Sequence, residues 1–278
     1  MILIFLSAGE LPAKHFRLCP AGHSTRVFIT GTVSSDRMNL LAIETSSPVL
    51  SVAVQVSGKA VVEECMEGFS RHAENLLPVL DRVLKIAGLG FEAVEAFLIG
   101  RGPGSFTGLR VGFATLKALV AGRPRPCFGA LTLDMIAEAV PAADPGMLSV
   151  CLDAHRDRFY VRHYKNSKGF WRPSGSPKVL SPQAWLDEVP EGAFVTGNAM
   201  ERYGDHFELA SARKGIKPLP RELWHPRASS LIHLFQRQDC KASARTAVKA
   251  LIKPAEFLPL YLRLSDPEER RRRHAAAC

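Results

Sequence analysis

The 278-residue chain is long enough to bury a substantial core, as one large domain or as two smaller ones. Its hydrophobic content of 46% and charged content of 23% are typical of a globular protein and exclude a globally disordered one. The formal net charge of +9 favours a polyanionic partner only weakly, because many ordinary enzymes are equally basic.

The cysteines and the apolar runs bear on the compartment. The six cysteines are scattered, and none forms a Cys-x-x-Cys pair, which argues against a structural zinc site and against a disulfide framework. The apolar run at residues 2–6 is too short for a signal peptide and has no basic segment before it. No apolar stretch approaches the length of a membrane span. We therefore expect a cytoplasmic protein without a membrane partner.

The two ends of the chain differ from the rest. Prolines and glycines interrupt any hydrophobic periodicity in residues 1–37, where only residues 26–30 resemble a strand. A regular pattern begins just after Met38, so we expect residues 1–37 to be a non-native or weakly ordered extension, with a genuine N-terminal module as the alternative. Residues 265–278 contain four consecutive arginines and are expected to form a basic, solvated tail, with a tRNA contact as the alternative.

Residues 38–145 alternate between strand and helix patterns. Strands are predicted at residues 40–44, 49–56, 60–65 and 96–99. Apolar residues at helical spacing predict helices at residues 73–87, ending at Gly88, and at residues 105–121, ending at Gly122.

Residues 146–264 repeat this order more weakly. Strands are predicted at residues 147–152, 158–164 and 193–196, and helices at residues 182–188 and 228–236. Three strands in hairpin order followed by helix, strand and helix is the order of an RNase H-like unit. We therefore predict an α/β, actin-like fold of two RNase H-like lobes, at residues 38–145 and 146–264, with mixed sheets flanked by helices.

The most distinctive motif is Gly-Arg-Gly-Pro-Gly-Ser-Phe-Thr-Gly at residues 100–108. Glycines before a helix N-terminus expose N–H groups, which suits a phosphate. No P-loop lysine follows, however, and no G-x-G-x-x-G is present. We therefore favour a tight turn with close packing over phosphate binding. Gly108, Gly112 and Thr115 share one helical face, which lets another helix approach closely.

Glu44 and Asp153 occupy equivalent places in the two halves of the chain, because each ends the first predicted strand of its half. In actin-like ATPases such carboxylates face each other across a cleft and organise Mg²⁺ with nucleotide phosphates. A turn-forming or capping role is the alternative. The candidates for a vestigial nucleotide cleft are Glu44, Thr45, Gly102, Gly104, Ser105 and Asp153. We expect no cofactor beyond weak binding of ATP or ADP with Mg²⁺.

Histidine spacing and nucleophile motifs argue against catalysis by this chain alone. No two of the nine histidines lie within four residues of each other, so a helical metal-ligand pair is absent from the sequence and no metal site is expected. Nothing matches G-x-S-x-G, the motif of a serine nucleophile on a sharp turn. We therefore predict no catalytic residues.

Five segments within residues 38–264 resemble the TsaB (YeaZ) family. They are Leu41-Ala42-Ile43-Glu44-Thr45-Ser46, His72-Ala73-Glu74-Asn75-Leu76-Leu77-Pro78, residues 100–110, Leu152-Asp153-Ala154-His155-Arg156, and Pro259-Leu260-Tyr261-Leu262-Arg263. The resemblance implies an actin-like (ASKHA) fold and a non-catalytic role as partner and stabiliser of TsaD, which transfers threonylcarbamoyl to tRNA. It also implies a TsaE-like ATPase and tRNA as partners within the complex. Glu44 and His155 depart from the Asp and Arg that are usual in the family.

The predicted helix at residues 73–87 has an apolar stripe wider than one sheet face requires. The resemblance implies that its second side meets matching helices of TsaD in a four-helix bundle, and we expect the isolated chain to form a homodimer through the same surface. The predicted partner-binding residues are Leu76, Val79, Leu80, Val83, Gly108, Gly112 and Thr115. Thr132 and Ile136 stand where the catalytic relative carries a metal-binding histidine pair. The alternative is an actin-fold enzyme, either a small-molecule kinase or a peptidase.

Overall fold

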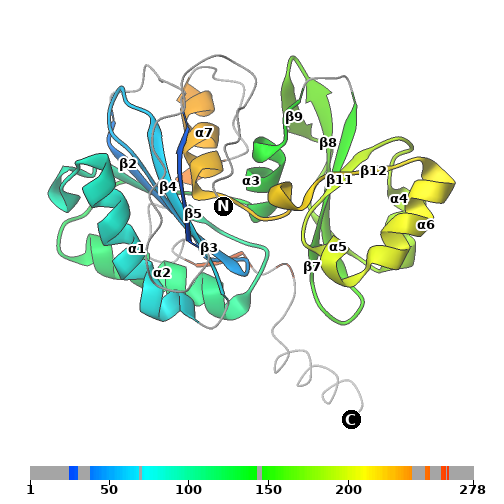
Figure 1. Ribbon diagram of the computed structural model, residues 1–278, viewed down its shortest axis with the longest axis horizontal. Coiled ribbons are helices and arrows are strands. Elements are labelled where there is room, and N and C mark those ends of the chain that lie inside the picture. The colour runs from blue at the N-terminus through cyan, green and yellow to red at the C-terminus, as the bar shows by residue number, and fades with distance from the viewer. Residues whose placement is uncertain are drawn as a thin grey trace, which may run out of the picture.

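The computed structural model describes residues 25–30, 38–68, 71–142, 146–239, 248–250, 258–260 and 262. The arginine-rich tail and most of the N-terminal extension lie outside these residues. The described chain forms two lobes, each a mixed sheet flanked by helices (Figure 1). Within the described ranges, no helix is long and apolar enough to cross a bilayer.

The sheet of the first lobe has seven strands in the order β1-β4-β3-β2-β5-β6-β13. The strands are β1 (Thr25–Thr30), β2 (Leu40–Glu44), β3 (Val49–Gln55), β4 (Val61–Glu67), β5 (Ala96–Gly100), β6 (Cys127–Ala130) and β13 (Val248–Ala250). β2, β3 and β4 form an antiparallel meander, and β5 runs parallel to β2 on its other side. This order confirms the first predicted RNase H-like unit.

One face of this sheet is covered by α1 (His72–Ala87) and α2 (Phe106–Ala121), with the short 3₁₀ turn η2 (Phe91–Ala93) between them. Apolar residues recur along α1 at intervals of three and four, so one stripe of the helix packs against β3 and β4. The helix ends where Gly88 adopts a left-handed conformation, with φ of 67°. Ser105 caps the start of α2, because its hydroxyl accepts a hydrogen bond from the Gly108 amide.

The second lobe repeats the topology, with the strand order β10-β8-β7-β11-β12 and β9 also paired with β8. Its strands are β7 (Met147–Asp153), β8 (Phe159–Ser167), β9 (Phe170–Pro173), β10 (Lys178–Leu180), β11 (Phe194–Thr196) and β12 (Lys217–Pro218). Its helices are α4 (Pro182–Glu188), α5 (Ala199–Arg202), α6 (Gly204–Lys214) and the 3₁₀ turn η3 (Arg221–Leu223). Because β7 pairs antiparallel with β8 and parallel with β11, the predicted fold class is confirmed for both halves.

The last described helix, α7 (Ala228–Asp239), belongs to the first lobe, although the sequence-based division placed these residues in the second. The backbone amide of Ala228 donates to the Ser51 hydroxyl at 2.9 Å, and Ser229 donates from its amide and its hydroxyl to the Glu63 carboxylate. The physical reason is an apolar sheet face that α1 and α2 leave uncovered. α7 covers it with Leu231, Ile232 and Phe235.

The N-terminal region also contributes to the first sheet. β1 pairs antiparallel with β4 along its whole length, from Thr25 opposite Met66 to Thr30 opposite Val61. The strand pattern seen at residues 26–30 therefore corresponds to an edge strand, and this part of the expected extension is paired in the sheet.

Helix α3 (Thr132–Ala139) connects the lobes and lies between them in Figure 1. Asp134 accepts hydrogen bonds from Arg162 at 2.8 Å and from the Tyr164 hydroxyl at 2.6 Å, both on β8. On the other side, Glu138 forms an ion pair with Arg237 of α7. These contacts fix the two sheets relative to each other through one short helix.

Candidate functional site

The glycine-rich turn packs against the segment that follows β2. A Cβ atom placed on Gly104, Gly108 or Gly112 would lie between 2.0 and 2.4 Å from atoms of Ser46 or Thr45, closer than any real Cβ contact. The Ser105 amide donates to the Ser46 carbonyl at 2.7 Å, and the Leu260 amide donates to the Arg101 carbonyl at 2.7 Å. The glycines therefore permit close packing within the lobe, which is the interpretation that the sequence favoured.

Glu44 is completely buried at the end of β2. Its Oε1 accepts a hydrogen bond from the Ser46 amide, whereas its Oε2 has no partner and lies against Gly100, where an added Cβ would be only 1.7 Å away. Burial raises the pKa of this carboxyl to about 7, and the hydrogen bonds with Ser46 oppose the shift. The side chain is thus enclosed by its own lobe.

Asp153 ends β7, as predicted, and anchors the β7–β8 turn. Its Oδ1 accepts the His155 amide at 2.7 Å, and its Oδ2 lies 3.6 Å from Nη1 of Arg202 on α5. Its own amide donates to Oδ1 of Asn198 at 3.0 Å. The side chain is only 14% exposed, so these local contacts use most of the carboxylate.

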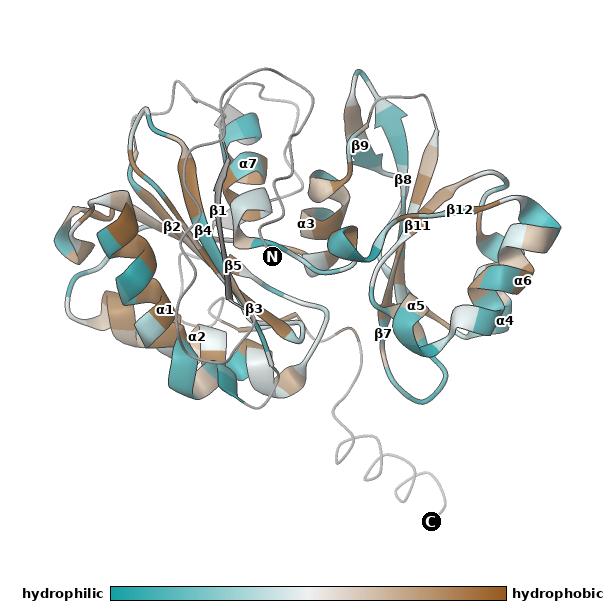
Figure 2. Ribbon diagram, in the orientation of Figure 1, coloured by the Kyte–Doolittle hydropathy of each residue, from teal (hydrophilic) through white to brown (hydrophobic). Residues whose placement is uncertain are grey.

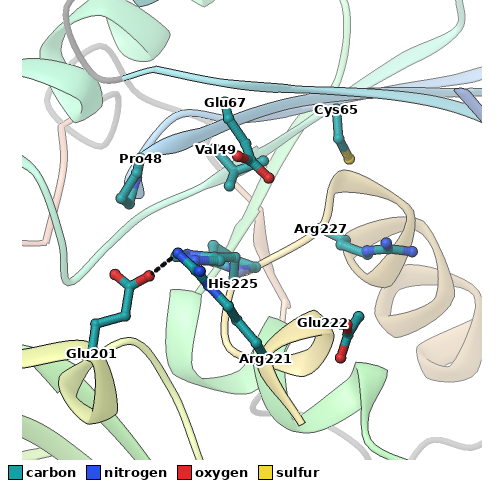
Figure 3. A pocket seen from close by; sticks show the side chains of 10 residues that line it. Pro48, Val49, Cys65, Glu67, Glu201, Arg221, Glu222, His225 and Arg227 are labelled. Carbon is teal, nitrogen blue, oxygen red and sulfur yellow. Dashed lines mark hydrogen bonds and ion pairs between the residues drawn. The ribbon is translucent and has the colours of Figure 1, made fainter. Parts of the chain in front are cut away.

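The structure brings five of the six predicted cleft residues together at the end of β2 and in the glycine-rich turn, namely Glu44, Thr45, Gly102, Gly104 and Ser105. Asp153 stays among its second-lobe partners. A cavity of about 310 Å³ does lie between the lobes (Figure 3). It is lined by Pro48, Val49, Cys65, Glu67, Glu201, Arg221, Glu222, His225, Pro226 and Arg227. None of the predicted cleft residues lines this cavity.

Charged groups make up half of the cavity lining. Arg221 pairs with Glu201, as Figure 3 shows, and burial lowers the pKa of the neighbouring His225. Burial also raises the pKa of Cys65, so its thiol stays protonated and is a poor nucleophile. Sequence reasoning missed this cavity because its lining comes from segments more than a hundred residues apart, and no local motif marks it.

The predicted partner-binding residues of α1 face the interior. Leu76, Val79, Leu80 and Val83 are at most 5% exposed and pack in the core between the helix and its sheet. Gly108 and Gly112 are buried against Thr45, and Thr115 is half-buried. This is a correction: the four α1 residues belong to the stripe that faces the sheet, and the two glycines of α2 pack against Thr45, so these six residues support the lobe itself.

The exposed apolar residues of α1 lie on the flanks of that buried stripe. Leu77 is 55% exposed and Ile86 is 49% exposed. They are nine residues apart, which places them half a turn from each other around the helix. Figure 2 shows apolar and polar residues alternating along α1, while α2 adds the exposed small residues Ala114 and Ala118. The surface formed by Leu77, Ala114 and Ala118 is called the α1–α2 face below, and Ile86 lies outside it.

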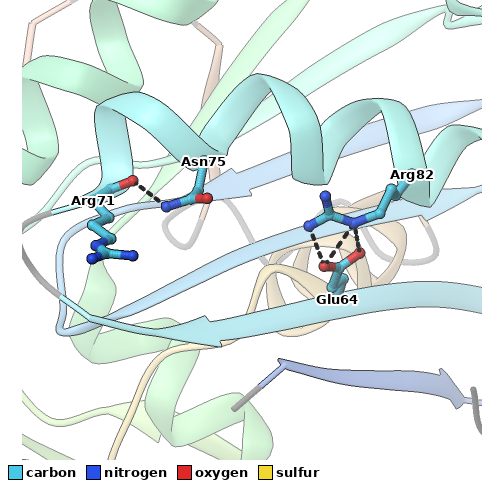
Figure 4. A network of polar contacts seen from close by, with 4 residues as sticks. All are labelled: Glu64, Arg71, Asn75 and Arg82. Carbon is cyan, nitrogen blue, oxygen red and sulfur yellow. Dashed lines mark hydrogen bonds and ion pairs between the residues drawn. The ribbon is translucent and has the colours of Figure 1, made fainter. Parts of the chain in front are cut away.

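A partly buried ion pair joins α1 to the sheet (Figure 4). Nη2 of Arg82 donates to Oε1 of Glu64 at 2.7 Å, and Nε of Arg82 lies 3.3 Å from Oε2. The Glu64 side chain on β4 is only 1% exposed, so Arg82 supplies the partner that a buried carboxylate requires. Because Arg82 points toward β4, Ile86 lies on the same flank, and Leu77 lies on the flank toward α2, which covers β5.

Thr132 and Ile136 are both buried on α3, at the positions compared with the metal-binding histidines of the catalytic relative. The Thr132 hydroxyl forms a hydrogen bond with the Ser46 hydroxyl at 2.9 Å, and Ile136 packs in the core of the second lobe. The Thr132 hydroxyl is therefore already hydrogen-bonded, and Ile136 offers only an alkyl group. Among the described residues, no three or more His, Cys, Asp or Glu side chains are grouped to hold a metal ion.

Comparisons with known proteins place this geometry in a family. Residues 67–256 match the family model described as "TsaD: tRNA N6-adenosine threonylcarbamoyltransferase". The tRNA threonylcarbamoyladenosine biosynthesis protein TsaB of Haemophilus influenzae is 29% identical over 237 residues, covering 81% of this chain and 94% of that protein. TsaB of Buchnera aphidicola is 32% identical over 205 residues, covering 73% and 95%.

A solved structure agrees with these relatives. YeaZ from Pseudomonas aeruginosa superposes with a TM-score of 0.64 at 26% sequence identity, covering 81% of this chain and all of that chain. Both the sequence and the fold therefore match over nearly the full length of the relatives. The chain belongs to the TsaB (YeaZ) family, whose curated members are named tRNA threonylcarbamoyladenosine biosynthesis proteins.

Proposed function

We propose that this protein is a non-catalytic subunit of the machinery that forms threonylcarbamoyladenosine on tRNA, and that it binds and stabilises a TsaD-type transferase through the α1–α2 face. The observation that carries the proposal is Leu77, a large apolar side chain that is 55% exposed on a helix whose inner stripe is already buried. An exposed leucine on the flank toward a second helix, which itself exposes small residues, is suited to packing against helices of a partner.

The non-catalytic role is supported by what stands at the catalytic positions. Thr132 and Ile136 provide no metal ligand of the kind that the relative uses, since one is hydrogen-bonded to Ser46 and the other is in the core. Glu44 is enclosed and, with its pKa raised to about 7, is only partly ionised at neutral pH. A carboxylate in that state holds Mg²⁺ poorly, so we infer that nucleotide binding is weak at most.

The wider assembly follows from the same proposal. We infer that a TsaE-like ATPase and tRNA join the complex, and that the protein acts in the cytoplasm, where tRNA is modified. In the absence of TsaD, the α1–α2 face would form a homodimer, since an exposed apolar surface is covered most readily by a second copy of itself. The alternative, an actin-fold kinase or peptidase, would be favoured by turnover of the isolated chain that TsaD leaves unchanged.

The proposal is tested by co-purification of TsaD with Leu77→Glu. A charge at this position would be buried without a partner in the interface, which we expect to weaken the complex by about 2 kcal/mol or more, roughly 30-fold in affinity. Ile86→Glu is the matched control, because it makes the same change on the same helix but on the flank toward β4. A folded Leu77→Glu protein that retains TsaD at full stoichiometry would place the interface elsewhere.

A further inference from the structure

The β7–β8 turn contains three consecutive non-glycine residues in the left-handed region. The φ angles are 59° for His155, 50° for Arg156 and 52° for Asp157. Elsewhere in the described part of the chain, Lys168 is the one other non-glycine residue with positive φ. Residues with a Cβ atom are strained in this conformation, and such strain persists only where the surroundings enforce it.

The contacts beneath the turn enforce this conformation. The Ala154 amide donates to the Arg158 carbonyl at 2.9 Å and closes the turn. Asp153 accepts the His155 amide, lies 3.3 Å from Nδ1 of the same histidine, and is itself held by Asn198. The buried acid is therefore the anchor of the turn.

The turn and the adjacent helix α5 place basic side chains at the surface. His155, Arg156, Arg158 and Arg202 are all exposed, and Arg202 reaches Asp153 at 3.6 Å, so α5 lies beside the turn. The Arg202 side chain is 56% exposed and the His155 side chain 76%. Arg156, Arg158 and Arg202 outnumber Asp157 and the partly buried Asp153. The exposed Glu201 beside Arg202 is paired with Arg221, so the surface is net positive.

We propose that this turn, together with Arg202, contacts the phosphate backbone of tRNA. Guanidinium groups bind phosphate oxygens in a bidentate manner, and cations spread over an exposed turn fit a series of phosphates better than one small anion in a pocket. Backbone contacts of this kind position an RNA without reading its sequence. The inference rests on the proposed function, because it takes tRNA to be the nucleic acid that the complex handles.

The experiment titrates labelled tRNA with the full chain and follows fluorescence anisotropy at several salt concentrations. The double variant Arg156→Glu with Arg158→Glu should bind about tenfold more weakly, and its log–log salt slope should be shallower by about 1.5, since each lost phosphate contact removes about 0.7–0.9. Lys165→Glu is the matched control, because this exposed residue lies toward the other end of β8.

A second variant separates binding from folding. Arg156→Gly removes the strained Cβ, so its melting temperature should stay the same or rise while its affinity for tRNA falls. A turn with a purely structural role would show no loss of affinity in this variant. Tight binding of the double variant with an unchanged salt slope would overturn the proposal, and so would an equal loss in Lys165→Glu.

Co-purification with TsaD is measured on the same variants and should be unchanged. Loss of TsaD with tRNA binding retained would assign the turn to a protein partner and would also overturn the proposal. Failure of the proposed function gives a different result, because the wild-type chain would then fail to retain TsaD while its Arg156 and Arg158 variants still lost tRNA.

Discussion

Replacing the buried acid Glu44 by glutamine should change the pH dependence of stability. Burial raises the pKa of the Glu44 carboxyl from 4.5 to about 7, so the folded state keeps its proton to a higher pH than the unfolded state does. The unfolded state ionises first as the pH rises, and the stability that protonated Glu44 supports is lost between about pH 4.5 and about pH 7. Glutamine remains neutral throughout and removes this loss.

The magnitude follows from the size of the shift. At about 1.36 kcal/mol per pKa unit, the rise from 4.5 to about 7 corresponds to a loss of about 3.4 kcal/mol of folding stability at pH values above both pKa values. About 2.5 kcal/mol of this loss falls between about pH 5 and about pH 8. In the Glu44→Gln protein, the amide oxygen could keep the hydrogen bond that Glu44 Oε1 accepts from the Ser46 amide. The amide nitrogen would take the place of Oε2 against Gly100 and would have no hydrogen-bond partner there. Protonated Glu44 also leaves a polar group unpaired at this position, so the cost of an unpaired group is shared by both proteins and cancels in the comparison.

The assay is urea unfolding of the wild-type and Glu44→Gln proteins at about pH 5 and about pH 8. We expect the variant to gain about 2.5 kcal/mol relative to the wild type on going to the higher pH. Glu74→Gln, an exposed change in the first turn of α1, is the control and should show no such gain. Equal differences between Glu44→Gln and wild type at both pH values would refute the argument that burial keeps Glu44 protonated.

Two further predictions follow from the packing of the first lobe. Gly112→Ala should destabilise the protein by about 1–2 kcal/mol in chemical unfolding, because the new Cβ would lie 2.4 Å from Oγ1 of buried Thr45 and this overpacking outweighs the better helix propensity of alanine. Gly204→Ala is the control and should be neutral or stabilising, because nothing lies within 4 Å of its Cβ. Adding Thr45→Ala should restore the stability of the Gly112→Ala protein, and a double variant without this rescue would contradict the contact. Deleting residues 1–37 should leave a cooperative melting transition and TsaD binding intact, because β1 is an edge strand that pairs with β4 alone among the described strands. A truncated protein that melts without cooperativity would show that β1 is required for the fold.

Much of the local structure was predictable because neighbours in the sequence determine it. The inner stripe of α1 follows from apolar residues at helical spacing, and its end follows from Gly88 in the left-handed region. The repeated order of strands and helices indicated the two RNase H-like lobes, since hairpins and crossovers follow short-range rules. The family was likewise recognisable from short motifs such as residues 100–108, whose residue types are contiguous in the chain.

Tertiary structure decided which side of each element is used. A helical pattern shows that Leu76 and Val83 share a face, but only the sheet beneath them shows that this face is the core and that Leu77 stays exposed. The glycines of α2 suggested the close approach of another helix, whereas the neighbour proves to be Thr45 of the same lobe. α7 returns to the first sheet, and Glu44 acquires its raised pKa, because of residues far away in the chain. Burial depends on such long-range contacts, and no local sequence pattern encodes them.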